Sequence, residues 1–136
     1  MRYLIDTNLL VNIVEGKYIS DDVYSILNNY ENIGYISSES IKEFIHLIQL
    51  GKLHPQKSIK FLDIFDFIEN TLGLTVKYVK EEHLKRLTTL DTVKDHTDPS
   101  DRLIISVALT ERFPVISSDK YFKYYKKQGL DLIFNK

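Results

Sequence analysis

Hydrophobic and polar positions follow two periods along the chain, and these predict short strands separated by longer helices. Helical spacing of apolar residues predicts helices over residues 21–31, 40–53, 58–73, 81–90, 99–113 and 120–129. Runs rich in β-branched and aromatic residues predict strands over residues 2–5, 34–37, 74–79, 114–118 and 130–134, the last of them at a sheet edge. Strands that alternate with helices need crossover connections, so we expect a mainly parallel sheet flanked by helices. The pattern predicts one α/β domain over residues 1–136.

Composition narrows the class of protein. The chain is 43% hydrophobic and 27% charged, as in an ordinary globular protein, and its formal net charge of −1 argues against a generally basic surface for nucleic acid. It has no cysteine, which excludes disulfides and cysteine-ligated zinc. No apolar run approaches the roughly 18 residues of a membrane span, and the N-terminus lacks the features of a signal peptide. We therefore expect a cytoplasmic protein with no membrane partner.

Acidic residues recur where the predicted strands end. Asp6 follows the first strand, Glu43 and Asp101 lie near the starts of helices, and Asp119 follows the fourth strand. The carboxyl ends of strands in an open α/β sheet line the crevice where ligands bind, so these acids can converge. Each also has a purely structural explanation. Two pairs, Asp98 with Asp101 and Ser40 with Glu43, fit the capping-box pattern, and Asp119 can cap the last long helix. Asp6 can brace a turn, and Thr7 or Asn8 can cap the segment that follows.

A divalent cation would explain the recurrence better than capping does. Two carboxylates about 4 Å apart repel by roughly 4 kcal/mol at an effective dielectric of 20, so they must take up protons or a cation. Ligand sets of oxygen atoms suit Mg²⁺ or Mn²⁺, which can activate a water against a phosphodiester. We therefore expect a metal site. Its candidate ligands are Asp6, Glu43, Asp98, Asp101 and Asp119.

The motifs that carry these acids resemble those of the PIN-domain nucleases, and in particular the VapC-like toxins of toxin–antitoxin pairs. "YLIDTNLLV" is similar to the opening motif, "SSESIKEFIHLIQLGKL" to the segment with the second acid, "HTDPSDRLIISVAL" to the strongest signature and "VISSDKYF" to the fourth element. In that order they run from residue 3 to about residue 122. Two departures are visible: Ser100 replaces the usual aromatic, and Lys42 stands where a tryptophan is common.

The resemblance implies a three-layer PIN fold and a Mg²⁺- or Mn²⁺-dependent endoribonuclease with Asp6, Glu43, Asp101 and Asp119 as catalytic acids. It also implies a cognate antitoxin, and we expect a homodimer. Candidates for contact with the substrate or the acids are Thr7, Asn8, Arg102, Ser118 and Lys120. The alternative is a catalytically inactive PIN fold that binds nucleic acid or a partner. "IDTN" also resembles phosphatases with an aspartyl nucleophile, which need a second acid where this chain has Asn8.

Several other features have two interpretations. The four histidines lack paired metal-ligand spacing and fit surface or helix positions, although His96 can orient the nearby acids. The segment "KYFKYYKKQG" fits either an amphipathic helix with a lysine-rich solvent face or a surface for phosphate contacts and base stacking. Arg102 can hold a phosphate, an antitoxin carboxylate or a plain salt bridge. The apolar helices over residues 21–31 and 58–73 fit ordinary core packing, a dimer surface or an antitoxin groove.

Overall fold

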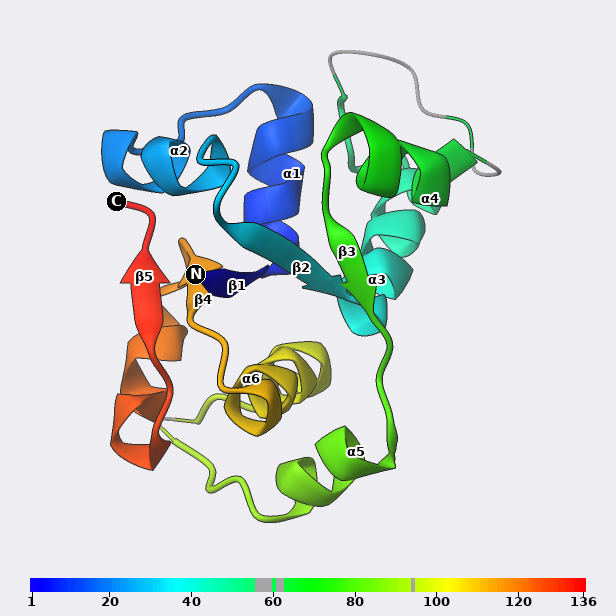
Figure 1. Cartoon of the computed structure of the whole chain (residues 1–136). Coiled ribbons are helices and arrows are strands. Elements are labelled where there is room, and N and C mark those ends of the chain that lie inside the picture. Colours follow the sequence, from blue (N-terminus) through cyan, green and yellow to red (C-terminus); the bar gives the residue numbers. More distant parts are fainter. Residues whose placement is uncertain (56–59, 61–62, 94) are drawn as a thin grey trace.

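The centre of the molecule is a parallel five-stranded sheet with the strand order β3-β2-β1-β4-β5. It is seen in a computed structural model that describes residues 1–55, 60, 63–93 and 95–136 (Figure 1). The strands are β1 (Arg2–Ile5), β2 (Ile33–Ser37), β3 (Thr75–Lys77), β4 (Val115–Ser117) and β5 (Leu132–Phe134). The predicted parallel sheet is confirmed, and so is the edge position of the last strand.

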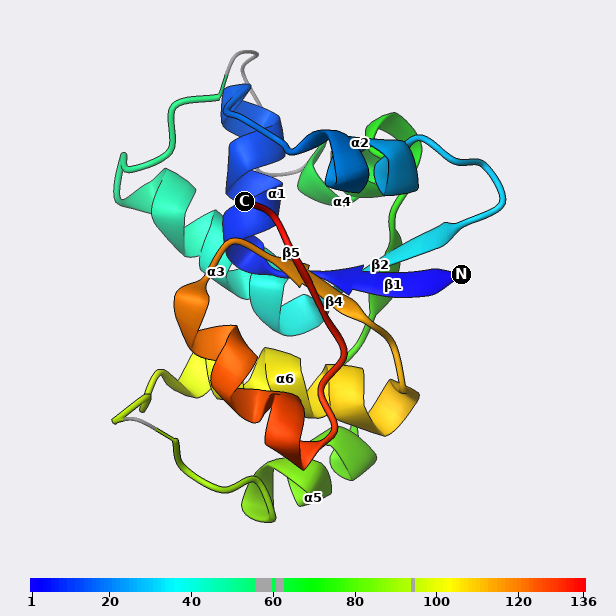
Figure 2. The same cartoon turned by 90° about the vertical axis from the view of Figure 1, so that its left-hand side faces the viewer.

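Helices cover both faces of this sheet, which gives three layers (Figures 1 and 2). One face carries α1 (Thr7–Glu15), α2 (Asp21–Leu27), α3 (Ser38–Gln49), α4 (Ile64–Asp66) and the short π-helix η2 (Phe67–Thr71). The other carries α5 (Glu81–Thr88), α6 (Pro99–Glu111) and the 3₁₀ helix η3 (Lys120–Gln128). Of the predicted helix over residues 58–73, residues 58, 59, 61 and 62 lie outside the described residues.

The side-chain alternation of β1 divides the interior into two apolar cores. Ile5 packs on one face with residues of α1, α2 and α3, whereas its neighbour Leu4 packs on the other with residues of α6 and η3. Both side chains are completely buried. Strand β1 is therefore held on both faces, and the residue after it has a fixed position.

Two expected helix caps are wrong. The helix after β1 is capped by Asp6 itself, whose side chain accepts from the backbone of Leu9, rather than by Thr7 or Asn8. Helix α3 is capped by Ser37 and begins at Ser38, so no capping box joins Ser40 to Glu43. In both cases the strand runs directly into its helix, which moves the cap one or more residues toward the N-terminus. The expected caps Asp98 and Asp119 are confirmed.

A close approach explains one glycine in the sheet. Gly34 on β2 lies opposite Tyr3 on β1, and a methyl group on Gly34 would come within 2.6–2.8 Å of the Tyr3 ring and hydroxyl. Elsewhere, none of the described helices is long and apolar enough to cross a membrane.

Candidate active site

The register of the central strands places Asp6 beside Ser117. Ile5 pairs with Ile116, so the residues after them are neighbours at the carboxyl edge of the sheet. The Ser117 hydroxyl donates to Asp6 Oδ2 at 2.5 Å and accepts from the backbone N–H of Asp119 at 2.9 Å. Asp6 Oδ1 accepts from the Leu9 N–H at 2.8 Å. Both oxygens of this buried carboxylate are thereby oriented by donors from two different elements.

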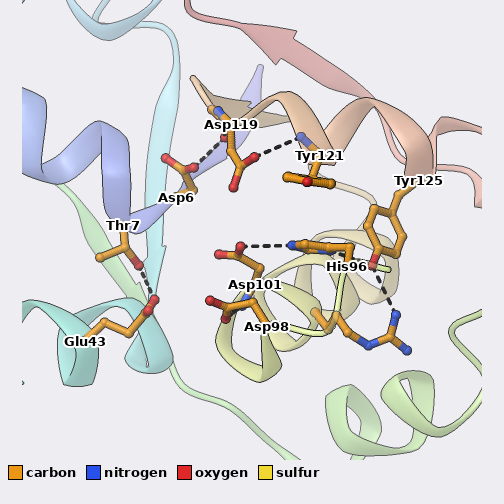
Figure 3. Close-up of polar contacts among 11 residues, drawn as sticks. Asp6, Thr7, Glu43, His96, Asp98, Asp101, Asp119, Tyr121 and Tyr125 are labelled. Carbon is orange, nitrogen blue, oxygen red and sulfur yellow. Dashed lines mark hydrogen bonds and ion pairs between the residues drawn. The ribbon is translucent and has the colours of Figure 1, made fainter. Parts of the chain in front are cut away.

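Asp101 enters the same space from the first turn of α6 (Figure 3). Its backbone N–H donates to the side chain of Asp98 at 3.0 Å, and its Oδ2 lies 3.1 Å from Nε2 of the buried His96. Asp119, the cap of η3, accepts from the Tyr121 N–H at 2.8 Å. One oxygen each of Asp101 and Asp119 and one nitrogen of His96 lie within 4.8 Å of one another, close enough to share a metal ion.

Glu43 approaches the other acids from α3 (Figure 3). Its Oε1 accepts a 2.6 Å hydrogen bond from the buried Thr7 hydroxyl, which follows Asp6 in the chain. Burial raises the pKa of Glu43, and the carboxylates of Asp98 and Glu39 act in the same direction. Glu43 and Asp98 are therefore near enough for each charge to affect the other.

The electrostatics of the acids show that they form one group. The pKa of Asp6 is raised to about 7, mainly because burial disfavours its charged form, and the charges of Asp101 and Asp119 add to the shift. The pKa of Asp101 is raised to about 6, again mainly by burial, with contributions from Asp98 and Asp119. Against this, hydrogen bonds from Ser117 and Leu9 favour the charged form of Asp6, and His96 favours that of Asp101.

Basic side chains do not neutralise this group. In the part of the chain that the structure describes, no lysine or arginine nitrogen lies within 4.0 Å of a carboxylate oxygen of the five candidate acids. Among the described residues, the only ion pair that involves one of these acids is that between His96 and Asp101. The acids thus form an anionic cluster at the carboxyl edge of the sheet, where a cation would be stabilised.

Sequence comparison identifies the family. The model of the PIN domain matches residues 3–128, which includes all five acids. The chain belongs to the PIN domain family. The family resemblance of the motifs and the expected fold are thereby confirmed. No significant match was found among curated proteins.

Solved structures with the same fold are similar to this PIN domain over nearly its whole length. VapBC2 from Rickettsia felis, bound to a DNA fragment from its promoter, matches with a TM-score of 0.72 at 20% identity and covers 100% of both chains. VapBC-1 from nontypeable Haemophilus influenzae matches with a TM-score of 0.66 at 18% identity over 98% of both chains. A toxin–antitoxin complex from Klebsiella pneumoniae reaches 0.58 at 14% identity over 86% of both chains. At these identities the likeness concerns the fold.

The candidate contact residues lie around the acids in different ways in this PIN domain. Arg102 donates to the carbonyls of Leu90 (2.8 Å) and Asp91 (3.2 Å) and to the hydroxyl of Tyr125, and it makes no ion pair among the described residues. The plain salt bridge is therefore not formed there, whereas the contact of Arg102 with a phosphate or an antitoxin carboxylate stays a prediction. Ser118 points to Asn135, which donates to it, whereas Asn8 and Lys120 are exposed.

The interpretation of the lysine-rich segment also needs correction. Phe122 and Tyr125 are completely buried, so neither can stack on a base. Tyr121 is 47% exposed and stacks on His96, with ring centroids 5.2 Å apart. The segment is amphipathic, as one of the two interpretations predicted, but with 3₁₀ rather than α-helical geometry.

Sequence reasoning missed two residues that hold the acids in place. Ser117 and Tyr125 carry no local signal, because their role depends on strand pairing and on packing across the domain. The alternation of side chains along β4 could have identified Ser117 as the residue beside Asp6. Ser100, at the position of the usual aromatic, donates to Glu39 at 2.9 Å and so joins α6 to α3.

A second group with metal-type ligands has a structural explanation. Glu82, His83 and Glu111 lie close enough to share an ion. The completely buried His83 accepts the Lys80 N–H at Nδ1 and faces Glu111 at 2.7 Å through Nε2, and Lys77 lies 3.4 Å from the other oxygen of Glu111. Both ring nitrogens of His83 are thus occupied, and a lysine already balances the carboxylate.

Proposed function

We propose that this PIN domain is a Mg²⁺- or Mn²⁺-dependent endoribonuclease that acts as the toxin of a toxin–antitoxin pair. The observation that carries the proposal is the convergence of Asp6, Asp101 and Asp119 at one edge of the sheet, without a lysine or arginine partner among the described residues. The family membership and the fold shared with VapBC complexes agree with it.

The residues of the cluster fit a hard divalent cation. Carboxylate oxygens are the protein ligands that Mg²⁺ and Mn²⁺ prefer, and here they come from separate elements. The raised pKa values of Asp6 and Asp101 indicate that their charges are poorly compensated, a cost that a bound cation would remove. Asp6, Asp101 and Asp119 would hold the ion, with Glu43 and Asp98 on the side toward α3. Once bound, such an ion lowers the pKa of a coordinated water and stabilises the charge that develops on a phosphodiester.

The chain's own residues would orient these ligands and admit the substrate. Ser117 and the Leu9 N–H fix the two oxygens of Asp6, and Thr7 fixes Glu43. On the rim, the exposed Lys120 directly follows Asp119 and is available to contact an RNA phosphate. Tyr121 offers a partly exposed ring beside it, suited to a base in a single-stranded segment.

Cleavage of RNA tests the proposal directly. The chain should cut RNA with Mg²⁺ or Mn²⁺, and EDTA should abolish the activity. Asp101→Asn should remove cleavage while the circular dichroism spectrum is unchanged. The matched control is Asp131→Asn, which makes the same change at an exposed residue outside the cluster. Cleavage that persists in EDTA or in Asp101→Asn would contradict the mechanism.

Absence of cleavage with retained RNA binding would favour the alternative, a PIN fold that binds without cutting. Sequencing the RNA ends after brief induction would identify the target.

The proposed partners are a small cognate antitoxin and a second copy of the chain. An arginine or lysine of the antitoxin would find a charge-assisted contact with Asp6 and Asp101. An apolar cavity of about 350 Å³ lies where α1, α2 and η2 meet, and its lining includes Ile13, Tyr24 and Leu72. It would accept apolar side chains of a partner helix. Light scattering of the isolated chain, with and without the product of the neighbouring gene, tests both partners. A protein that stays monomeric and does not bind that product would contradict both.

A further inference from the structure

A continuous series of hydrogen bonds leads from the half-buried Arg102 to the candidate active site, and Figure 3 shows Tyr125, His96 and Asp101 of this series. Arg102 Nη1 lies 3.1 Å from the hydroxyl of Tyr125, which lies 2.8 Å from Nδ1 of His96. On the other side of the ring, His96 Nε2 lies 3.1 Å from Oδ2 of Asp101. The four residues come from α6, η3 and the loop before α6, so the chain connects three parts of the fold.

The direction of each hydrogen bond follows from the donors available. A guanidinium group can only donate, so the Tyr125 oxygen accepts from Arg102. Tyr125 is completely buried, and its O–H needs an acceptor. Among the described residues His96 Nδ1 is the acceptor within reach. Nδ1 is then unprotonated, and the ring proton lies on Nε2, where it is donated to Asp101.

The other protonation states of the ring are inconsistent with this geometry. A proton on Nδ1 alone would leave the Nε2 lone pair facing a carboxylate oxygen of Asp101 at 3.1 Å. An imidazolium would offer a donor to Tyr125 at Nδ1 and leave the buried hydroxyl proton without an acceptor. Only the neutral Nε2–H tautomer gives each polar atom of Arg102, Tyr125, His96 and Asp101 in this series a matching hydrogen-bond partner.

Packing holds the ring in this orientation. His96 is 6% exposed, stacked on Tyr121 with an interplanar angle of 10° and edge-on to Tyr125 at 71°. Arg102 is anchored in turn by the carbonyls of Leu90 and Asp91. A ring flip that exchanges the two nitrogens of the imidazole would therefore break its hydrogen bonds with both Tyr125 and Asp101.

We propose that His96 is a positioning residue, fixed as its Nε2–H tautomer by Tyr125 and Arg102, that holds Oδ2 of Asp101 and leaves Oδ1 for a ligand. His96 is then not a metal ligand itself, although its Nε2 lies close enough to share an ion with Asp101 and Asp119. The consequence for metal binding rests on the proposed function, whereas the tautomer does not.

The tautomer can be measured in the unmodified protein. In ¹⁵N spectra of the metal-free full chain at neutral pH, protonated and unprotonated ring nitrogens resonate far apart. His96, assigned by comparison with His96→Gln, should show a protonated Nε2 and an unprotonated Nδ1. A protonated Nδ1, or rapid exchange between the two tautomers, would overturn the proposal. This measurement requires neither a metal nor RNA.

Variants test the positioning role through metal affinity. Tyr125→Phe removes the hydroxyl and keeps the ring, so His96 loses its hydrogen bond at Nδ1 while Asp101 still accepts from Nε2–H. The ring is then held at one end alone, and Mn²⁺ binding should weaken by about 10- to 100-fold, as for other groups that orient ligands. Tyr78→Phe, at an exposed tyrosine outside these hydrogen bonds, is the control and should leave the Mn²⁺ affinity unchanged. An unaltered Mn²⁺ affinity in Tyr125→Phe would overturn the proposal, provided that its melting curve shows a folded protein.

A conservative replacement separates hydrogen bonding from packing. His96→Gln retains an amide donor for Asp101, whereas His96→Leu removes it, so the glutamine variant should keep more of the Mn²⁺ affinity. Equal losses in both would overturn the positioning role. An active nuclease with a protonated Nδ1 would contradict only this inference. A chain with the assigned tautomer that binds Mn²⁺ but cuts no RNA would contradict only the proposed function.

Discussion

The hydroxyl of Thr7 donates a 2.6 Å hydrogen bond to Glu43, which joins the first turn of α1 to the second turn of α3. The two residues are 36 positions apart, and each follows one of two paired strands. The contact therefore forms only when β1 and β2 are in register, and it aims Glu43 along the carboxyl edge of the sheet.

Replacing Thr7 by valine should misplace Glu43 with little change in volume. The pKa of Glu43 should rise further, because the hydrogen bond that lowers it is lost. Affinity for Mn²⁺ should fall by about 10-fold or more, as for other groups that orient ligands. Calorimetric titration with Mn²⁺ measures this. Thr7→Ser, which keeps the hydroxyl, should bind the metal like the wild type; an equal loss in serine and valine variants would assign the effect to packing instead.

Without metal, the protein should be more stable in mild acid than at neutral pH. The pKa of Asp6 is raised to about 7 and that of Asp101 to about 6, above the ordinary aspartate value of 3.8, so the folded state binds protons more tightly than the unfolded chain. The free energy of unfolding should therefore fall as the pH rises from about 4 to about 7. Urea denaturation in EDTA across this range measures the slope.

The control for that slope is Asp6→Asn, which should flatten it and stabilise the metal-free protein at pH 7. Asparagine still accepts the Leu9 N–H as a helix cap, but it carries no charge to bury. The same variant should lose the stabilisation that Mg²⁺ or Mn²⁺ gives to the wild type. Because Asp101 also contributes, part of the slope should remain in Asp6→Asn; a slope as steep as that of the wild type would exclude Asp6 as a cause.

Metal binding should also depend on pH in the opposite sense to metal-free stability. The ligands must be ionised, so affinity for Mn²⁺ should rise between pH 5 and pH 7 as Asp101 and then Asp6 lose their protons, with pKa values of about 6 and about 7. Titrations at several pH values test this, and an affinity independent of pH would remove both carboxylates from the ligand set.

Glu111 should matter for stability rather than for metal binding. In Glu111→Leu the buried Nε2–H of His83 loses its acceptor, which costs about 1–3 kcal/mol of unfolding free energy. Glu111→Gln keeps an acceptor and should cost less. Mn²⁺ affinity should be the same in both variants and in the wild type. A loss of metal binding would instead identify Glu82, His83 and Glu111 as a second site.

Gly34→Ala should strain the contact between the two central strands. The added methyl group would lie within 2.6–2.8 Å of the buried Tyr3 side chain, which has to shift. Overpacking of this kind costs about 1–3 kcal/mol. Denaturation with urea should show the loss, and a second substitution, Tyr3→Val, should relieve part of it. Additive losses in the double variant would exclude the clash as the cause.

The local sequence pattern was sufficient to predict the parallel sheet and the helix caps Asp98 and Asp119. Alternation of strand-like and helix-like segments predicts parallel crossovers, and an acid directly before a helical run predicts a cap such as Asp98. These features depend on neighbours in the chain. No helix was predicted over α1, and the start of α3 was placed at Ser40 instead of Ser38, because in both places the strand runs almost directly into its helix and no loop marks the boundary.

The partners of the acids could not be predicted from such patterns. Ser117 reaches Asp6 across 111 residues and Tyr125 reaches His96 across 29, and both contacts exist only after the strands and η3 have packed. The contacts of Arg102 have a related origin: although it follows an aspartate in the sequence, its side chain donates to backbone carbonyls that the fold brings near. The four acids lie in recognisable motifs, whereas the residues that orient them are defined by tertiary structure.

The position of β4 between β1 and β5 has a consequence for the synthesis of the protein. During translation β1, β2 and β3 leave the ribosome before β4 does. Until β4 emerges, β1 lacks one of its two neighbouring strands. During that interval Asp6 has neither Ser117 to orient it nor Asp119 beside it. For the proposed nuclease, this order would keep the growing polypeptide inactive on its own ribosome until β4 has emerged.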